Sequence, residues 1–231
     1  MSITCRGCCG RWVFPPQKPE RRAVERDEAA IRHWITHDWP RLKRRAARRR
    51  AHLVFIDETG FLLHPLVRRT WGLRGQTPVL RQRTRHRRKV SAIGGLSISP
   101  GRRRLGWYWQ LHLDQAIAQD QVIAFLRHLR RHLRGEIIVV WDRLGAHRGK
   151  KLRQWLGHGH RLHLEYLPPY APELNPNEYA WSHTKTNPLA NYAPDTAEEL
   201  HAAVLVAATD LAAAQKLLRS FVHATGLPIR L

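Results

Sequence analysis

The chain has 231 residues, enough for one well-packed core with a small appendage, and it carries 40 Lys and Arg against 18 Asp and Glu. This net charge of +22 predicts a surface that binds the phosphates of DNA or RNA. A bias toward Arg codons is the alternative, but it does not account for the shortage of acids. No run of about 18 apolar residues and no signal-peptide core is present, so we expect an intracellular protein without a transmembrane helix.

The cysteines lie together at the N-terminal end of the sequence. Cys5, Cys8 and Cys9 are an odd number confined to one end, which is not the pattern of a disulfide framework. The C-x-x-C-C spacing resembles half of a zinc site, but no second Cys pair follows and the first His is His33. We therefore expect no zinc site there.

Residues 15–50 are rich in Pro and Arg and then take a helical pattern. Ala29, Ile31, Trp34 and Ile35 form a short apolar stripe, which Pro40 is expected to break. A basic run over residues 41–50 follows. It is either the solvated face of a helix or a linker that contacts phosphates, and the residues alone leave both interpretations open.

The middle of the chain predicts strands. Residues 52–56 are continuously apolar, as in a strand covered on both faces, and the turn-rich residues 68–80 follow. After a basic stretch, residues 90–99 and 105–113 predict a hairpin that turns through Pro-Gly.

The second half alternates between helical and strand patterns. Residues 115–134 predict an amphipathic helix that Gly135 ends, and later helices begin at Pro176 and at Asp195, the last one running to Gly226. Thr196 and Glu199 fit a capping box. Between these helices lie a strand over residues 137–141, a helix over 145–156 and a strand over 163–168. This order predicts an α/β fold with a mixed sheet, an antiparallel hairpin plus parallel strands, and helices on its faces.

Three acidic residues lie where such a fold would bring them together. Asp57 and Asp142 each follow an apolar strand, and Glu178 follows Asn-Pro at a helix start. If the two strands are parallel neighbours, both Asp carboxylates reach the same edge of the sheet, where α/β folds bind ligands. Glu178 can then lie over the pair.

Carboxylates from three separate segments are suited to divalent metal ions. Two Mg²⁺ ions about 4 Å apart can serve both ends of a phosphodiester displacement, and Mn²⁺ is the natural substitute. Three acids would supply one bridging and two flanking ligands. Without metal, such a cluster repels itself and raises at least one pKa.

Each acid also has an ordinary interpretation, and other acids compete with these three. An Asp at a strand end or a Glu in the first turn of a helix is common. Among the competitors, Glu58 should point to the opposite face from Asp57, and Asp120 should be exposed on its helix. Glu173, in the Pro-rich loop, is the most serious rival of Glu178.

The segments FIDETGF, RTWGLRGQTPVL, VVWDRLGAHRGK and LPPYAPELNPNEYAW, taken in this order, resemble bacterial insertion-sequence transposases of the mariner superfamily. The resemblance is strongest to the branch numbered six-thirty and runs from about Pro16 to the C-terminus. It implies an RNase H-like catalytic domain. Thirty-five residues separate Asp142 from Glu178, close to the short spacing of that superfamily.

The resemblance implies roles for individual residues. Asp57, Asp142 and Glu178 would be the catalytic, metal-binding acids of an enzyme that nicks DNA at the ends of a mobile element. The freed 3′-hydroxyl would then attack target DNA, usually at TA. His147 would contact DNA or fix a turn, and Trp181 would pack. A further family segment has no chemical role that we can assign: Trp71, Gly75, Gln76, Thr77 and Pro78.

Basic residues before the predicted hairpin are candidates for contacts with the DNA backbone. Neutralising Arg87, Arg88 and Lys89 should weaken DNA binding and flatten its salt dependence. A metal site at His158, His160 and His163 is disfavoured, because His alone is a weak signal. The full set of candidate DNA-binding residues is Arg81, Arg83, Arg85, Arg87, Arg88, Lys89 and His147.

Two departures from the family pattern stand out. Arg143 replaces an Asn that many relatives have after the second Asp, and the helix-turn-helix modules that normally come first are not recognisable. We therefore expect residues 1–50 to be a basic segment and linker of a truncated transposase, and residues 51–231 to be the catalytic domain.

The resemblance also implies partners and a location. The partners would be element ends and target DNA, a second copy in a homodimer, and a separate N-terminal DNA-binding part. The location would be the bacterial cytoplasm, at the nucleoid. Two alternatives remain: a non-catalytic DNA-binding remnant of a decayed transposase, or another RNase H-like nuclease such as a resolvase.

Overall fold

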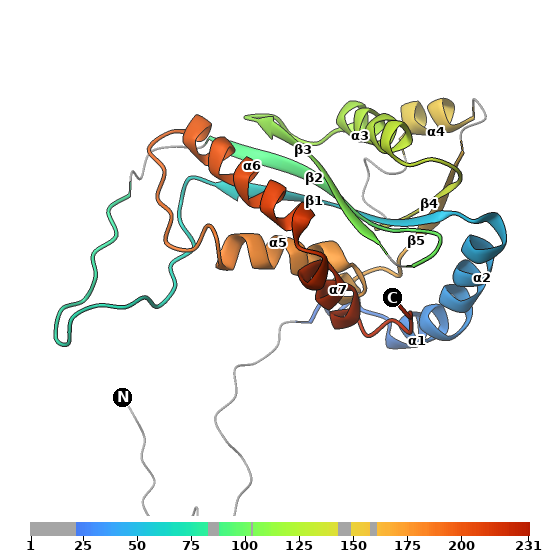
Figure 1. Cartoon of the computed structure of the whole chain (residues 1–231), viewed down its shortest axis with the longest axis horizontal. Coiled ribbons are helices and arrows are strands. Elements are labelled where there is room, and N and C mark those ends of the chain that lie inside the picture. Colours follow the sequence, from blue (N-terminus) through green and yellow to red (C-terminus); the bar gives the residue numbers. More distant parts are fainter. Residues whose placement is uncertain (1–21, 83–87, 103, 143–148, 158–160) are drawn as a thin grey trace, which may run out of the picture.

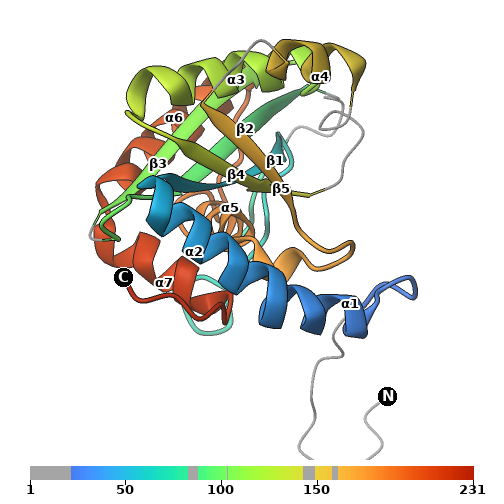
Figure 2. The same cartoon turned by 90° about the vertical axis from the view of Figure 1, so that its right-hand side faces the viewer.

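The computed structural model describes residues 22–82, 88–102, 104–142, 149–157 and 161–231. Within them, the strands form one mixed sheet with helices on both faces (Figures 1 and 2), which confirms the predicted fold class. The order of strands across the sheet is β3-β2-β1-β4-β5. The strands are β1 (His52–Leu62), β2 (Lys89–Ile98), β3 (Leu105–Leu113), β4 (Ile137–Trp141) and β5 (Leu162–Tyr166).

The sheet changes from antiparallel to parallel pairing at β1. The pairs β1–β2 and β2–β3 are antiparallel, whereas β1–β4 and β4–β5 are parallel. The parallel ladder of β1 ends at Phe55, opposite Val140, but β1 itself continues to Leu62 because β2 pairs with it along its whole length. The prediction that this strand ends at residue 56 was therefore wrong, and Asp57 lies inside a strand.

The alternation of side chains along β1 divides the core into two layers. Leu53 and Phe55 pack with α1, α2, α5, α6 and α7, whereas Val54 and Ile56 pack with α3 and α4. The helical elements are α1 (Glu28–His33), η1 (Trp34–Asp38), α2 (Trp39–Arg49), α3 (Gln119–His132), α4 (Lys150–Leu156), η3 (Pro172–Leu174), α5 (Pro176–Thr186), α6 (Ala197–Ala213) and α7 (Gln215–Ala224). No helix in the described part of the chain is long and apolar enough to cross a membrane.

Pro40 does not break the N-terminal helix, contrary to the prediction. The chain passes through the π-helical turn η1 and continues as α2, with Pro40 in the first turn of α2. A Pro lacks the N–H group and crowds the carbonyl four residues earlier, and a wider turn just before it relieves both problems. The basic run therefore lies on a helix.

The last predicted helix is two helices. The first of them, α6, ends at Ala213. The next residue, Ala214, has a φ of −85° and a ψ of 68°, which are not helical, and α7 then starts at Gln215. The Gln215 side chain accepts a hydrogen bond from the N–H of Leu105 and donates one to its carbonyl, at 3.1 and 2.8 Å. This contact with β3 fixes the bend. The helix predicted to begin at residue 115 is α3, which begins later, at Gln119. Gly135 turns the chain after this helix, with a φ of 86°.

Candidate active site

Two of the predicted acids lie beside the end of the parallel ladder. Asp57 and Asp142 each come two residues after the last parallel pair, Phe55 and Val140. Asp57 has the same alternation as Phe55, so it faces the layer that contains α5, and it is only 8% exposed. With Glu178 of α5, the two Asp residues line one cavity of about 410 Å³.

The start of α5 is tied to the strand that carries Asp57. Asn175 caps the helix: its side-chain oxygen accepts a hydrogen bond from the N–H of Asn177, at 3.2 Å. Its amide nitrogen donates to the carbonyl of Ile56, at 3.1 Å. Glu178 lies in the first turn of α5, so this buried Asn sets its position relative to Asp57. The sequence showed Asn175 only as a helix start, and its bond to β1 was not predicted.

Trp181 holds the middle of α5 against the sheet. Its ring lies 4.9 Å from that of Trp107 and 6.1 Å from that of Phe61, both edge-on. Gly94, which pairs with Asp57 across β1 and β2, makes room for it, because a Cβ atom there would lie 2.5 Å from the Trp181 ring. Trp181 therefore packs, as predicted.

The carboxylates of the cavity raise one another's pKa. Burial raises the pKa of Asp57 well above its ordinary value, and the charges of Glu178, Glu58 and Asp142 raise it further. Burial also raises the pKa of Glu178, and Asp142 adds to the effect while Lys185 opposes it. Placing negative charge in this cavity is costly, and a cation would offset the cost.

Lys185 brings a positive charge to the same side of the sheet. It follows Glu178 by seven residues, two helical turns, and its Nζ donates to the Thr59 hydroxyl at 2.7 Å. Burial lowers the pKa of Lys185, whereas Glu178 and Asp57 act to raise it. Lys185 was not among the predicted residues, although its spacing of two helical turns places it on the same helix face as Glu178.

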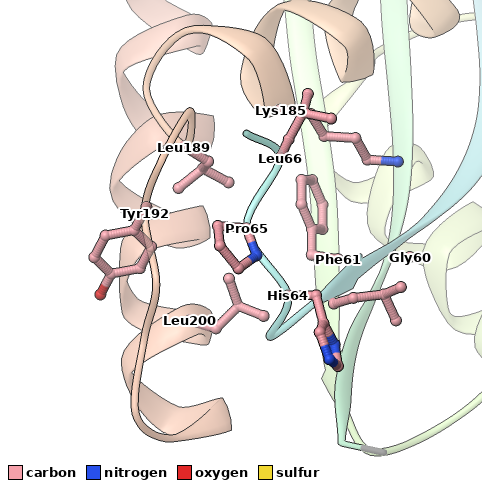
Figure 3. Close-up of a pocket in the computed structure, with 10 residues that line it drawn as sticks. Gly60, Phe61, His64, Pro65, Leu66, Lys185, Leu189, Tyr192 and Leu200 are labelled. Carbon is pink, nitrogen blue, oxygen red and sulfur yellow. The ribbon is translucent and has the colours of Figure 1, made fainter. Parts of the chain in front are cut away.

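The stem of Lys185 also lines a second pocket, which is mainly apolar. Figure 3 shows this pocket of about 190 Å³, where the end of β1 and the segment after it meet residues from Lys185 to Leu200. No Asp or Glu among the described residues lines it. The acidic chemistry therefore belongs to the cavity around Asp57.

The competing acids are placed elsewhere. Glu58 lines a different cavity, beside Lys89 and Ser91, as strand alternation predicts. Asp120 is exposed and forms an ion pair with Lys151. These two acids therefore stand apart from the cavity of Asp57.

Glu173 is held by an arginine at the rim of the structure. Arg26 donates to both Glu173 carboxylate oxygens, at 2.5 and 3.0 Å. Burial acts to raise the pKa of Glu173, but the bonds and charge of Arg26 outweigh it and lower the pKa. Glu173 does not line the cavity that Glu178 lines.

The donor atoms of the cavity suit a hard divalent cation. Asp57, Asp142 and Glu178 offer only carboxylate oxygens, the ligands that Mg²⁺ and Mn²⁺ prefer, whereas zinc sites favour His and Cys. Within the described ranges, no three His, Cys, Asp or Glu side chains are arranged to hold one ion as they stand. Since Mg²⁺ keeps several waters and needs one or two carboxylates, this residue set still fits it.

The candidate DNA-binding residues are only partly described. Arg81 is exposed, and Lys89 is half-buried. Arg88 forms ion pairs with Asp114 at 2.7 Å and with Glu198 at 2.6 Å, so its charge is matched within the protein. Several predicted residues lie outside the described residues: Cys5, Cys8, Cys9, Arg83, Arg85, Arg87, Arg143, His147, His158 and His160.

Two further sequence features are described. His163 pairs with Glu136 at 2.5 Å. Trp71 is 99% exposed, on a segment between β1 and β2 that projects from the sheet (Figure 1). Gly75 has a φ of 81°, which explains the glycine at this turn.

Residues 52–201, more than half of the chain, match the family described as DDE superfamily endonuclease. The chain belongs to this family. The matched region contains Asp57, Asp142 and Glu178 and all the strands described above. No curated protein matches the sequence of this DDE-family chain.

Solved structures share the fold of this DDE-family chain. The Mos1 transposase paired-end complex with left transposon end has a TM-score of 0.62 at 20% identity, covering 92% of this chain and 64% of that one. The Mos1 mariner paired-end complex with Mn has a TM-score of 0.59 at 18% identity, with 93% and 66% covered. At these identities the likeness shows the fold alone, which is RNase H-like. The chain spans about two thirds of the length of these transposase chains.

Proposed function

We propose that this chain is the catalytic part of a DDE transposase, which cuts DNA strands at the ends of a mobile element and joins them to target DNA. The observation that carries the proposal is that Asp57, Asp142 and Glu178 line one cavity inside the family region. The related fold of Mos1, whose structures include complexes with transposon ends and with Mn or Mg, supports DNA as substrate and a divalent metal as cofactor. The spacing between Asp142 and Glu178 supports the mariner superfamily, and the order of the sequence motifs supports its bacterial six-thirty branch.

The three carboxylates share one role in this proposal. Asp57, Asp142 and Glu178 would hold the metal, and Asp57 is the most buried of the three. Bound Mg²⁺ would supply the charge that activates a water oxygen and stabilises the leaving oxygen. Asn175 and Trp181 keep Glu178 in position, and Lys185 offsets part of the negative charge while the cavity holds no other cation.

A second candidate function is DNA binding without cleavage. The observation in its favour is that, within the described residues, no three His, Cys, Asp or Glu side chains are arranged to hold one ion as they stand. On this alternative, the positive surface would bind DNA while the cavity remained inert.

The deciding experiment is nicking of a labelled DNA duplex by the purified chain, with Mg²⁺, with Mn²⁺ and with a chelator. Asp142→Asn should reduce metal-dependent nicking by at least about 100-fold, since even indirect damage to a metal site costs 10–100-fold. DNA binding should persist. The matched control is Asp120→Asn, which removes an exposed carboxylate and should leave nicking unchanged.

The two candidates give different results. Nicking that needs metal, that Asp142→Asn abolishes and that Asp120→Asn leaves unchanged supports the transposase. Binding without nicking under every metal condition favours the inert alternative, and nicking that survives Asp142→Asn means that the site assignment is wrong. We further propose that residues 51–231 form the catalytic domain and that two copies act together.

A further inference from the structure

A basic cavity lies apart from the carboxylate cavity. It is formed where α2 meets the turn between β2 and β3, and it measures about 250 Å³. Its cationic lining residues are Lys43, Arg44 and Arg102, and among the described residues no Asp or Glu lines it. Pro40 and Ala47 complete the wall.

Five of the basic residues of α2 divide into two rows. Arg41 and Arg45 bind Glu165, at 3.4 and 2.6 Å, and Arg49 lies 3.7 Å from Glu136. These arginines recur every four residues, so they share the helix face next to β5, and their charges are matched by acids.

The other row faces the cavity. Lys43 and Arg44 lie between the paired arginines in sequence, so they project from a different side of α2, and both line the cavity. The basic run of the sequence therefore contains structural ion pairs on one face and cations facing a cavity on another.

Lys43 is held in place rather than left mobile. Its Nζ donates to the carbonyl of Pro228 at 2.5 Å and lies 5.9 Å from the centre of the Trp39 ring. Burial lowers the pKa of Lys43, and the charges of Arg102 and Arg44 lower it further. These cations therefore repel one another, and a bound anion would offset the repulsion.

The backbone of the turn between β2 and β3 fixes the position of Arg102. Its backbone is left-handed, with a φ of 55°, and its N–H donates to the carbonyl of Ser99 at 2.8 Å. This turn follows Ile98, which pairs with Leu53 at the start of β1. Arg102 is thus on the end of the sheet that α2 covers, with its position set by the hairpin.

We propose that this cavity binds a phosphate group of the DNA backbone, as a second anchor point for the DNA that the carboxylate cavity acts on. The proposal rests on the proposed function in taking DNA as the partner. The residues offer charge but no aromatic ring or acceptor in the lining to read a base, so the contact positions DNA without sequence preference.

A short length of β2 connects the strand position beside Asp57 with the turn that carries Arg102. Gly94, the partner of Asp57, lies four residues from Ile98 at the end of β2, which is about 13 Å of strand. That is about four base pairs of duplex at 3.4 Å each. Both α2 and α5 pack on the same face of the sheet.

The test is DNA binding at several salt concentrations, in the Asp57→Asn background and without divalent metal, so that no cleavage occurs. Replacing both Arg44 and Arg102 by Gln should lower the slope of log affinity against log salt by about 1, since the cavity binds one phosphate and each phosphate contact contributes about 0.9. The matched control replaces Arg131 and Arg134 by Gln. These exposed residues lie in and just after α3, on the opposite face of the sheet.

Each outcome decides the question. A reduced slope in Arg44→Gln/Arg102→Gln alone supports the proposal, provided that thermal unfolding shows the variant to be folded. If that variant does not fold, Arg44→Gln alone should lower the slope by part of this amount, because Lys43 and Arg102 still line the cavity. An unchanged slope, or an equal loss in the control, overturns it.

Two further arms separate this inference from the proposed function and from a free-phosphate site. Nicking of DNA by the otherwise unaltered chain, together with an unchanged slope in the variant, contradicts only the second anchor. A chain that binds no duplex contradicts both. Inorganic phosphate, compared with chloride at equal ionic strength, should compete only weakly, and strong competition without a change in slope would assign the cavity to free phosphate.

Discussion

At the scale of single residues, Asp57 shows how a fold makes a carboxylate dependent on a cation. It is buried in β1 with Glu58 beside it in sequence and with Glu178 and Asp142 brought near by folding. Burial and these charges raise its pKa, so the metal-free native state holds a proton on Asp57 to higher pH than the unfolded state does.

We predict that the Asp57 carboxyl of the metal-free protein contributes a loss of stability as pH rises from the ordinary Asp pKa, about 3.9, toward neutrality. The sign follows because the native state binds more protons than the unfolded state over this range. Asp57→Asn should remove much of this loss, so the metal-free variant should unfold at a higher temperature than the parent near pH 7. The measurement is thermal unfolding at several pH values with a chelator.

Bound metal should stabilise the protein near neutral pH, where the ionised carboxylates of the metal-free protein destabilise it. Mg²⁺ at about 100 times its dissociation constant should stabilise the parent by about 2.7 kcal/mol, and Asp57→Asn should reduce this gain. Asp120→Asn, the exposed control, should behave like the parent in both respects. The same dependence of metal-free stability on pH in the parent and in Asp57→Asn would contradict the assignment of the cavity.

At the scale of elements, the position of Glu178 depends on how closely α5 lies on the sheet. Gly94 and Gly95 are neighbours in β2 that face opposite layers. A Cβ on Gly94 would lie 2.5 Å from the Trp181 ring, whereas a Cβ on Gly95 would lie 3.2 Å from Phe125 of α3. A substitution at Gly94 therefore affects the layer with α5, which carries Glu178, whereas a substitution at Gly95 affects the layer with α3.

We predict that Gly94→Ala destabilises the protein by about 1–3 kcal/mol, the usual cost of overpacking, and lowers nicking by displacing α5. Gly95→Ala should cost less, and nicking per folded molecule should stay at the parental level. Urea unfolding and nicking assays on both variants measure the two effects. Equal losses of nicking in the two variants would show that α5 does not set the geometry of the cavity.

At the scale of the whole molecule, the N-terminal helices are part of the same core as the sheet. Trp39 and Leu42 are buried in the layer that also contains Phe55 and Leu218. The predicted boundary between residues 50 and 51 therefore separates segments that share a hydrophobic core.

We predict that Leu42→Ala destabilises the whole domain by about 2–5 kcal/mol, in one cooperative transition, because it leaves a cavity in this core. Leu205→Ala is the matched control: Leu205 is 44% exposed on α6, and its loss should change stability by less than about 0.5 kcal/mol. Urea unfolding followed by Trp fluorescence measures both. A separate early transition in the Leu42→Ala variant would instead make α1 and α2 an independent unit.

Local patterns were sufficient for most of the elements and for the choice of acids. The strand over residues 137–141 and the hairpin strands were predicted because apolar runs and turn residues are properties of neighbours in sequence. The same reasoning placed Glu58 away from Asp57. It could not place the end of β1, because β2, a distant partner, extends that strand past residue 56.

What the sequence by itself determined was the mixed α/β fold, the set of candidate acids and the positive charge. Each of these depends on periodicity, composition or motif order. Only the tertiary structure decided that Glu178 rather than Glu173 lines the cavity with Asp57, because Arg26 binds Glu173 from 147 residues away. It alone separated the arginines of α2 into paired and cavity-facing rows, since their acidic partners come from distant strands and ion pairs depend on distance in space.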